Sequence, residues 1–156
     1  MSIFFISDLH LEEKKPHLTE AFKNFINSKL SPKDELFILG DFFEQWIGDD
    51  YEDNFIKSIK DVLKEISNSG TKIFLMHGNR DFLIGQKFCK EIGANLIEEP
   101  YTLEIDNRKI LLMHGDSLCT DDEDYQNFRK LVRNKEWQDE FPVSYTHLRA
   151  HETLQH

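Results

Sequence analysis

Four small groups of acidic, amide and imidazole side chains each follow an apolar run in this sequence. They contain Asp8 and His10, then Asp41, then Asn79, and finally His114. A carboxylate combined with an imidazole suits Mn²⁺, Fe²⁺ or Zn²⁺ better than Ca²⁺, which prefers oxygen ligands alone. One such group is usually an ordinary turn, but four in succession indicate a metal-dependent enzyme.

Asp41 comes between the other groups, and this order predicts a site for two ions. A carboxylate has two oxygens and can hold one ion with each. We therefore expect Asp41 to bridge one ion held by Asp8 and His10 and a second ion held by Asn79 and His114. Two ions about 3.5–4 Å apart activate water and stabilise an in-line displacement at phosphorus.

The spacing of apolar residues indicates how these groups converge. Apolar runs predict strands that end directly before the four groups, over residues 3–7, 36–39, 71–76 and 109–113. Helical spacing predicts helices over residues 18–30, 53–69 and 82–92. Because strands in an open α/β sheet collect ligands at their carboxyl ends, we expect an α/β fold with the site at that edge. The alternation of the first strand should place Asp8 and His10 on one face.

Further along the chain, short strands are predicted over residues 94–97 and 101–105, and Asp106 and Asn107 predict a hairpin turn after the second of these.

Glycines at positions 40, 78 and 115 agree with a backbone that turns sharply beneath a ligand. We expect Trp46 to pack under its loop and His77 to be structural.

Two acidic features have simpler interpretations than ligation. We expect Asp81 to orient its own turn. The acidic residues 49–53 are interpreted as the solvated start of a helix, where the macrodipole favours negative charge.

Composition limits the classes of partner. The chain has 156 residues, 39% of them hydrophobic, which is enough for one core. Its net charge of −10 argues against a nucleic-acid binder, which would need a basic surface. No apolar segment is long enough to span a bilayer and no leader is recognisable, so we expect a cytoplasmic protein. Cys89 and Cys119 form no Cys-x-x-Cys pair and are expected to be reduced.

The four motifs, Asp-x-His, Gly-Asp, Gly-Asn-x-Asp and His-Gly-Asp, resemble those of the calcineurin-like metallophosphoesterase superfamily. The resemblance implies a double β-sandwich flanked by helices, a four-layer αββα fold. Longer segments, residues 6–11, 39–50, 77–85 and 114–122, are similar to the branch of diphosphatases that act on UDP-2,3-diacylglucosamine.

That resemblance implies hydrolysis of UDP-2,3-diacylglucosamine to 2,3-diacylglucosamine 1-phosphate (lipid X) and UMP, a step of lipid A biosynthesis. It implies two Mn²⁺ ions, with Mg²⁺, Fe²⁺ or Zn²⁺ as alternatives. Asp8, His10 and Asp41 would hold the first ion, and Asp41, Asn79 and His114 the second. The branch works peripherally on the cytoplasmic face of the bacterial inner membrane, and the oligomeric state stays open.

Substrate contacts are implied for Asn79 and Arg80 at the phosphates and for Asp122 at the head group. Arg80 stands where a histidine is common elsewhere in the superfamily. A guanidinium agrees with this role because it can engage phosphate oxygens bidentately and stays charged at every working pH.

The C-terminal part departs from the superfamily pattern. The sequence contains no Gly-His-x-His element, which would supply one further ligand to each ion. Residues 143–153 resemble the translation of a transposase-type sequencing adaptor, so we interpret residues 143–156, with His147 and His151, as a non-native tail.

The metallophosphoesterase domain is therefore expected over residues 1–142, incomplete at its C-terminus and without its lid. We expect the polypeptide with this sequence to bind metal weakly and to have little activity. Two alternatives stay open: a metallophosphoesterase for another nucleotide or phosphoester, and an inactive fragment.

Overall fold

The structure, a computed structural model, describes residues 1–114. Four features singled out in the sequence lie outside the described residues. These are Gly115, Cys119, Asp122 and the segment 143–156.

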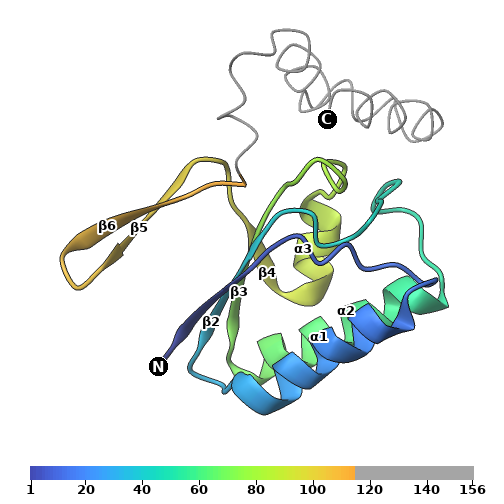
Figure 1. Cartoon of the computed structure of the whole chain (residues 1–156), viewed down its shortest axis with the longest axis horizontal. Coiled ribbons are helices and arrows are strands. Elements are labelled where there is room, and N and C mark those ends of the chain that lie inside the picture. The colour runs from blue at the N-terminus through green and yellow to red at the C-terminus, as the bar shows by residue number, and fades with distance from the viewer. Residues whose placement is uncertain (115–156) are drawn as a thin grey trace, which may run out of the picture.

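A four-stranded parallel sheet forms the centre of the described chain (Figure 1). Its strands lie in the order β1 (Ile3–Ile6), β2 (Glu35–Leu39), β3 (Lys72–Met76) and β4 (Ala94–Leu96). In the register, Ile6 pairs with Ile38 and Leu39 with Met76. The loops that follow the first three strands therefore leave the sheet at one edge, as the sequence predicts.

Three helices cover one face of this sheet: α1 (Pro16–Lys29), α2 (Asn54–Ser69) and α3 (Gln86–Ile92). Alternate strand residues, among them Leu36, Ile38, Ile73 and Leu75, are buried against them. These side chains form the larger core cluster, to which α2 contributes Ile59 and Leu63. The alternation of the strands thus supplies one apolar face to the helices.

The predicted bounds of α2 are confirmed within one residue, but those of α3 are wrong. Asp53 caps α2 by accepting a hydrogen bond from the Ile56 N–H at 2.8 Å, and Gly70 ends it with φ at 119°. Helix α3 begins at Gln86 rather than at residue 82. Phe82 and Ile84 are apolar because they are buried in the preceding turn, each 1% exposed, and not because they belong to a helix.

The opposite face of the sheet packs against a hairpin of β5 (Tyr101–Ile105) and β6 (Arg108–Leu112). Asp106 and Asn107 have φ of 50° and 65°, which confirms the predicted turn. Phe37 and Met76 from the sheet meet Leu112 from the hairpin in a second, smaller core cluster. The described residues thus form a helical layer, a parallel sheet and a hairpin, in keeping with the expected fold class.

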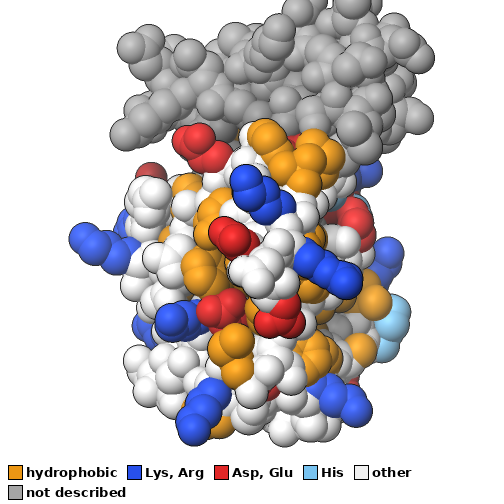
Figure 2. All heavy atoms as spheres, turned by 90° about the vertical axis from the view of Figure 1, so that its left-hand side faces the viewer, with side chains coloured by type: hydrophobic (Ala, Val, Ile, Leu, Met, Phe, Trp, Pro, Cys, Tyr) orange, Lys and Arg blue, Asp and Glu red, His pale blue; other side chains and the backbone are white. Residues whose placement is uncertain are grey.

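Hydrophobic side chains are exposed on the hairpin side of the molecule. Figure 2 shows them interspersed with charged side chains on that face. Phe5 and Leu111 are 44% and 58% exposed. Within residues 1–114, none of the helices combines the length and the apolar content that crossing a membrane requires.

Candidate metal centre

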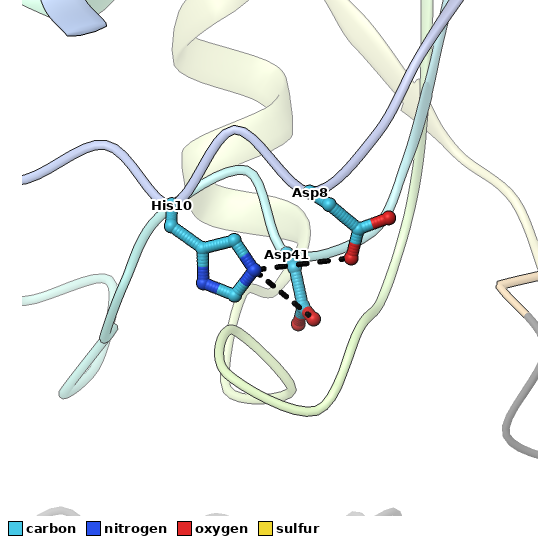
Figure 3. Close-up of side chains that lie close together, drawn as sticks. All are labelled: Asp8, His10 and Asp41. Carbon is cyan, nitrogen blue, oxygen red and sulfur yellow. Dashed lines mark ion pairs between the residues drawn. The ribbon is translucent and has the colours of Figure 1, made fainter.

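The loops after β1 and β2 run side by side, and this pairing assembles the site. The Asp8 N–H donates to the Gly40 carbonyl at 3.1 Å, and the His10 N–H donates to the Asp41 carbonyl at 2.9 Å. The Leu11 N–H continues the pairing. The side chains of Asp8 and His10 therefore meet that of Asp41 from the neighbouring loop (Figure 3).

All three residues of this cluster have a left-handed backbone. Their φ angles are 57° for Asp8, 50° for His10 and 52° for Asp41. This conformation is uncommon outside glycine and costs about 1–3 kcal/mol where the surroundings enforce it. The expectation that strand alternation places Asp8 and His10 on one face is wrong, because β1 ends at Ile6. Left-handed turns beyond the strand end bring the two side chains together.

The potential ligand atoms of the cluster lie close enough for one cation. His10 Nε2 is 3.8 Å from Asp8 Oδ1 and 3.7 Å from Asp41 Oδ2. The three atoms all lie within 4.8 Å of one another. Ligands that bind one ion at about 2.0–2.2 Å are themselves separated by no more than about 4.4 Å. A divalent transition metal therefore fits the donor set after small side-chain movements.

His114 also lies close to Asp41. Its Nε2 lies 3.3 Å from Asp41 Oδ2, and its Nδ1 lies 2.9 Å from the Leu39 carbonyl oxygen. Because a carbonyl only accepts, Nδ1 donates to it, and Nε2 is the ring nitrogen that faces Asp41. The side chain of His114 is only 6% exposed.

The two oxygens of Asp41 have different contacts. Oδ2 faces the Nε2 atoms of both His10 and His114. Oδ1 instead accepts a hydrogen bond from the Arg80 N–H at 2.8 Å. Oδ1 thus ties Asp41 to the loop after β3, and Oδ2 is the oxygen directed toward the two histidines.

The pKa of Asp41 also fits a ligand. Burial alone raises the pKa of this carboxyl, but hydrogen bonds from His114 and the Arg80 N–H outweigh that effect. Together with the charge that His114 and His10 carry when protonated, these hydrogen bonds hold the pKa of Asp41 below its ordinary value. Asp41 is therefore ionised and able to bind a cation at neutral pH.

Glycines make room for these contacts, as the sequence predicts at positions 40 and 78. A Cβ on Gly40 would lie 2.6 Å from His114 Nδ1, and the φ of Gly40 is 97°. A Cβ on Gly78 would overlap the backbone nitrogen and Oδ1 of Asp41. Both positions accordingly exclude any side chain.

Asp81 joins the loops after β2 and β3. This fully buried carboxylate accepts hydrogen bonds from the N–H groups of Gly78 at 2.9 Å and Phe42 at 2.7 Å, and also from Asp41 at 3.2 Å. Burial and then the charge of Asp41 raise the pKa of Asp81 to about 6. The sequence predicts only that Asp81 orients its own turn, and the structure shows that it also holds the Asp41 loop.

The loop after β3 places Asn79 and Arg80 next to this cluster. Asn79 lies between Gly78 and Arg80, whose backbones contact Asp81 and Asp41. The Arg80 guanidinium lies 3.5 Å from Glu44 Oε1. His77 contacts the Ile84 carbonyl through Nε2 and closes this loop, which agrees with its predicted structural role.

Glu44 and Asp49 are the two residues whose roles the sequence does not reveal. Glu44 Oε2 lies 3.6 Å from His10 Nδ1. Asp49 is not part of a solvated helix start, because it accepts hydrogen bonds from Trp46 Nε1 at 2.9 Å and from the Phe88 N–H at 2.9 Å. No sequence signal pointed to this cap, because the helix predicted over residues 82–92 places Gly85 inside the helix and not at its start.

Other predicted packing roles are confirmed. Trp46 is 1% exposed beneath its loop, and Cys89 is a free, buried thiol. Burial raises the pKa of Cys89 to about 12, so it is an inert core residue.

Comparison with known proteins agrees with this geometry. The family model for the calcineurin-like phosphoesterases matches residues 1–155. A Pseudomonas paraeruginosa protein named UDP-2,3-diacylglucosamine hydrolase is 52% identical over 134 residues, 86% of this chain and 56% of that protein. An Ectopseudomonas mendocina protein of the same name is 52% identical over 132 residues, 85% of this chain and 54% of that protein.

The chain thus spans about half the length of the curated relatives it matches. A solved structure of an Aquifex aeolicus protein of unknown function shares the fold. Its TM-score is 0.53 at 22% identity, over 89% of this chain and 74% of that one. From the matched family model and the relatives, the chain belongs to the calcineurin-like phosphoesterase family.

Proposed function

We propose that the protein hydrolyses the diphosphate of UDP-2,3-diacylglucosamine to 2,3-diacylglucosamine 1-phosphate (lipid X) and UMP, in lipid A biosynthesis. The observation that carries this proposal is the 52% identity, over 86% of the chain, to a protein named UDP-2,3-diacylglucosamine hydrolase. The cluster of Asp8, His10 and Asp41 supports it, because cleavage of a phosphoric anhydride by water is chemistry that such a site performs.

Five residues would hold the ions. Asp8, His10 and Asp41 would bind the first, and Asp41, Asn79 and His114 the second. Mixed oxygen and nitrogen donors suit Mn²⁺, Fe²⁺ or Zn²⁺. We propose Mn²⁺, as the family resemblance implies, with Mg²⁺, Fe²⁺ or Zn²⁺ as substitutes. When bound, two such ions would activate a water molecule and neutralise the charge that develops on the diphosphate.

The residues of the chain itself orient the substrate in this proposal. The Arg80 N–H donates a hydrogen bond to Asp41 Oδ1 at 2.8 Å. The Arg80 side chain is therefore attached to the backbone close to the proposed ions. A guanidinium can engage two phosphate oxygens at once. Asn79 would contact the same phosphates, and Asp122 the head group.

A lipid substrate also determines where the protein would work. UDP-2,3-diacylglucosamine carries acyl chains that favour a bilayer and a nucleotide that favours water. We therefore propose peripheral binding at the cytoplasmic face of the inner membrane.

Release of UMP from UDP-2,3-diacylglucosamine, measured with and without Mn²⁺ on a version of the protein extended to the full length of its relatives, tests the proposal. We expect release only with a divalent metal, and at least a hundredfold less for Asp41→Ala, which loses a ligand shared by both ions. Asp61→Ala, an exposed carboxylate on α2, is the matched control. Unchanged release by Asp41→Ala would refute the site. Equal hydrolysis of a UDP-sugar without acyl chains would favour the alternative nucleotide substrate.

A further inference from the structure

Glu44 contacts two residues of the candidate site with its two carboxyl oxygens. Oε2 lies 3.6 Å from His10 Nδ1, and Oε1 lies 3.5 Å from Arg80 Nη1. The Glu44 N–H donates to the Leu11 carbonyl at 3.0 Å. This bond fixes the backbone of Glu44 in register with the segment that carries His10.

The contact with His10 favours one tautomer of its ring. Nε2 faces Asp8 and Asp41, whereas Nδ1 faces Glu44. An imidazole that binds a cation through Nε2 carries its proton on Nδ1, and a carboxylate beside Nδ1 stabilises that form. For His114, the Leu39 carbonyl has the same role at 2.9 Å. The two histidines thus face Asp41 in equivalent ways, one oriented by a backbone carbonyl and the other by Glu44.

The contact of Glu44 with Arg80 concerns phosphate binding. Arg80 is held by its backbone at Asp41 Oδ1 and by its guanidinium at Glu44. A side chain that is ordered before its ligand arrives loses less conformational freedom on binding. The pairing also cancels the charge of Glu44, which would otherwise repel an anionic phosphate at close range.

We propose that Glu44 is a positioning residue that uses its two oxygens separately. Oε2 orients His10 toward a divalent cation, and Oε1 orients Arg80 toward a phosphate group. This rests on the proposed function, since it takes His10 as a metal ligand and Arg80 as the phosphate-binding residue. Glu44 itself touches neither the cation nor the phosphate.

A double-mutant cycle on the whole chain tests both contacts by binding, without turnover. Electron paramagnetic resonance of free Mn²⁺ gives the metal affinity, and calorimetry with UMP at saturating Mn²⁺ gives the phosphate affinity. The variants are Glu44→Gln, which keeps the size of the side chain, Arg80→Ala and their combination. Glu13→Gln is the control, because it removes an exposed carboxylate from the same 460 Å³ cavity that Glu44 lines. Urea unfolding checks that each variant keeps its fold.

We expect Glu44→Gln to weaken Mn²⁺ binding about 10–100-fold, in the presence and in the absence of the Arg80 side chain. UMP binding should weaken severalfold only where Arg80 is present. Glu13→Gln should change either affinity less than about twofold, as a screened surface charge does.

Two results would overturn the inference: Mn²⁺ binding by Glu44→Gln as tight as that of the control, or a loss of UMP affinity that persists in the Arg80→Ala background. Failure of the unmodified chain to bind Mn²⁺ would instead refute the proposed metal site, and the inference with it.

Discussion

Replacing Asp49 by alanine distinguishes the structure from the simplest interpretation of the sequence. As part of an acidic, solvated helix start, Asp49 would be dispensable. In the structure its carboxylate accepts hydrogen bonds from the N–H groups of Gly85 at 3.1 Å and Phe88 at 2.9 Å, and from Trp46 Nε1 at 2.9 Å. It thus caps α3 from a loop 36 residues earlier in the chain and satisfies an indole that is 1% exposed.

The expected cost follows from these contacts. Loss of a helix cap destabilises by about 0.5–2 kcal/mol, and a buried donor left without its acceptor costs about 1–3 kcal/mol. We therefore expect Asp49→Ala to lower the free energy of unfolding by about 2–4 kcal/mol. Asp49→Asn should lose less, because its amide oxygen still accepts from one of the donors.

Urea unfolding followed by far-ultraviolet circular dichroism measures this difference. Asp50→Ala is the matched control, since Asp50 is the exposed neighbour in the same acidic run. We expect it to change the stability by less than about 0.5 kcal/mol. An equally small change for Asp49→Ala would refute the capping role and return Asp49 to the solvated helix start.

Three further expectations concern groups away from the candidate site. Backbone N–H groups of two serines hold the pKa of Asp34 below its ordinary value of 3.8. Its stabilising effect is therefore complete above that pH and is lost as the pH falls through the lower native pKa, so Asp34→Asn should flatten the acid limb of a urea-midpoint profile. Lys60→Met should change stability by less than about 1 kcal/mol by the same assay, because the carboxylates left behind, Glu52 and Glu91, are 47% and 31% exposed and can be hydrated. Cys89, with its pKa raised to about 12, should resist iodoacetamide at pH 8 in the native protein and react in urea, as peptide mass spectrometry will show.

Periodicity predicts most of the fold because it reports which face of an element is buried. The strands that precede the four groups, the bounds of α2 and the turn at Asp106 and Asn107 are all apparent in the sequence. The same signal fails at residues 82–84, where the apolar side chains are buried in a turn. Apolar residues that are buried in a turn give the same sequence pattern as the apolar face of a helix.

The candidate site is predictable in its residue types but not in its supports. Asp8, His10 and Asp41 can be recognised because they belong to a succession of four such groups, each of which follows a predicted strand. Glu44, Asp49 and Asp81 act on residues in other loops, and nothing local distinguishes them from surface acids. Only the fold decides which acidic residues face donors and which face water.

The backbone strain of the cluster indicates why these supports are needed. Three left-handed residues each cost about 1–3 kcal/mol, whereas one inter-loop hydrogen bond contributes only about 0.5–1.5 kcal/mol net. The backbone pairing of the loops after β1 and β2 therefore offsets only part of this strain. Asp81 adds bonds from a buried carboxylate to both Gly78 and the Asp41 loop, and charged acceptors contribute more than neutral ones. Asp81, a carboxylate outside the cluster, thus supports the left-handed conformation of Asp41, whose Oδ2 faces the imidazoles.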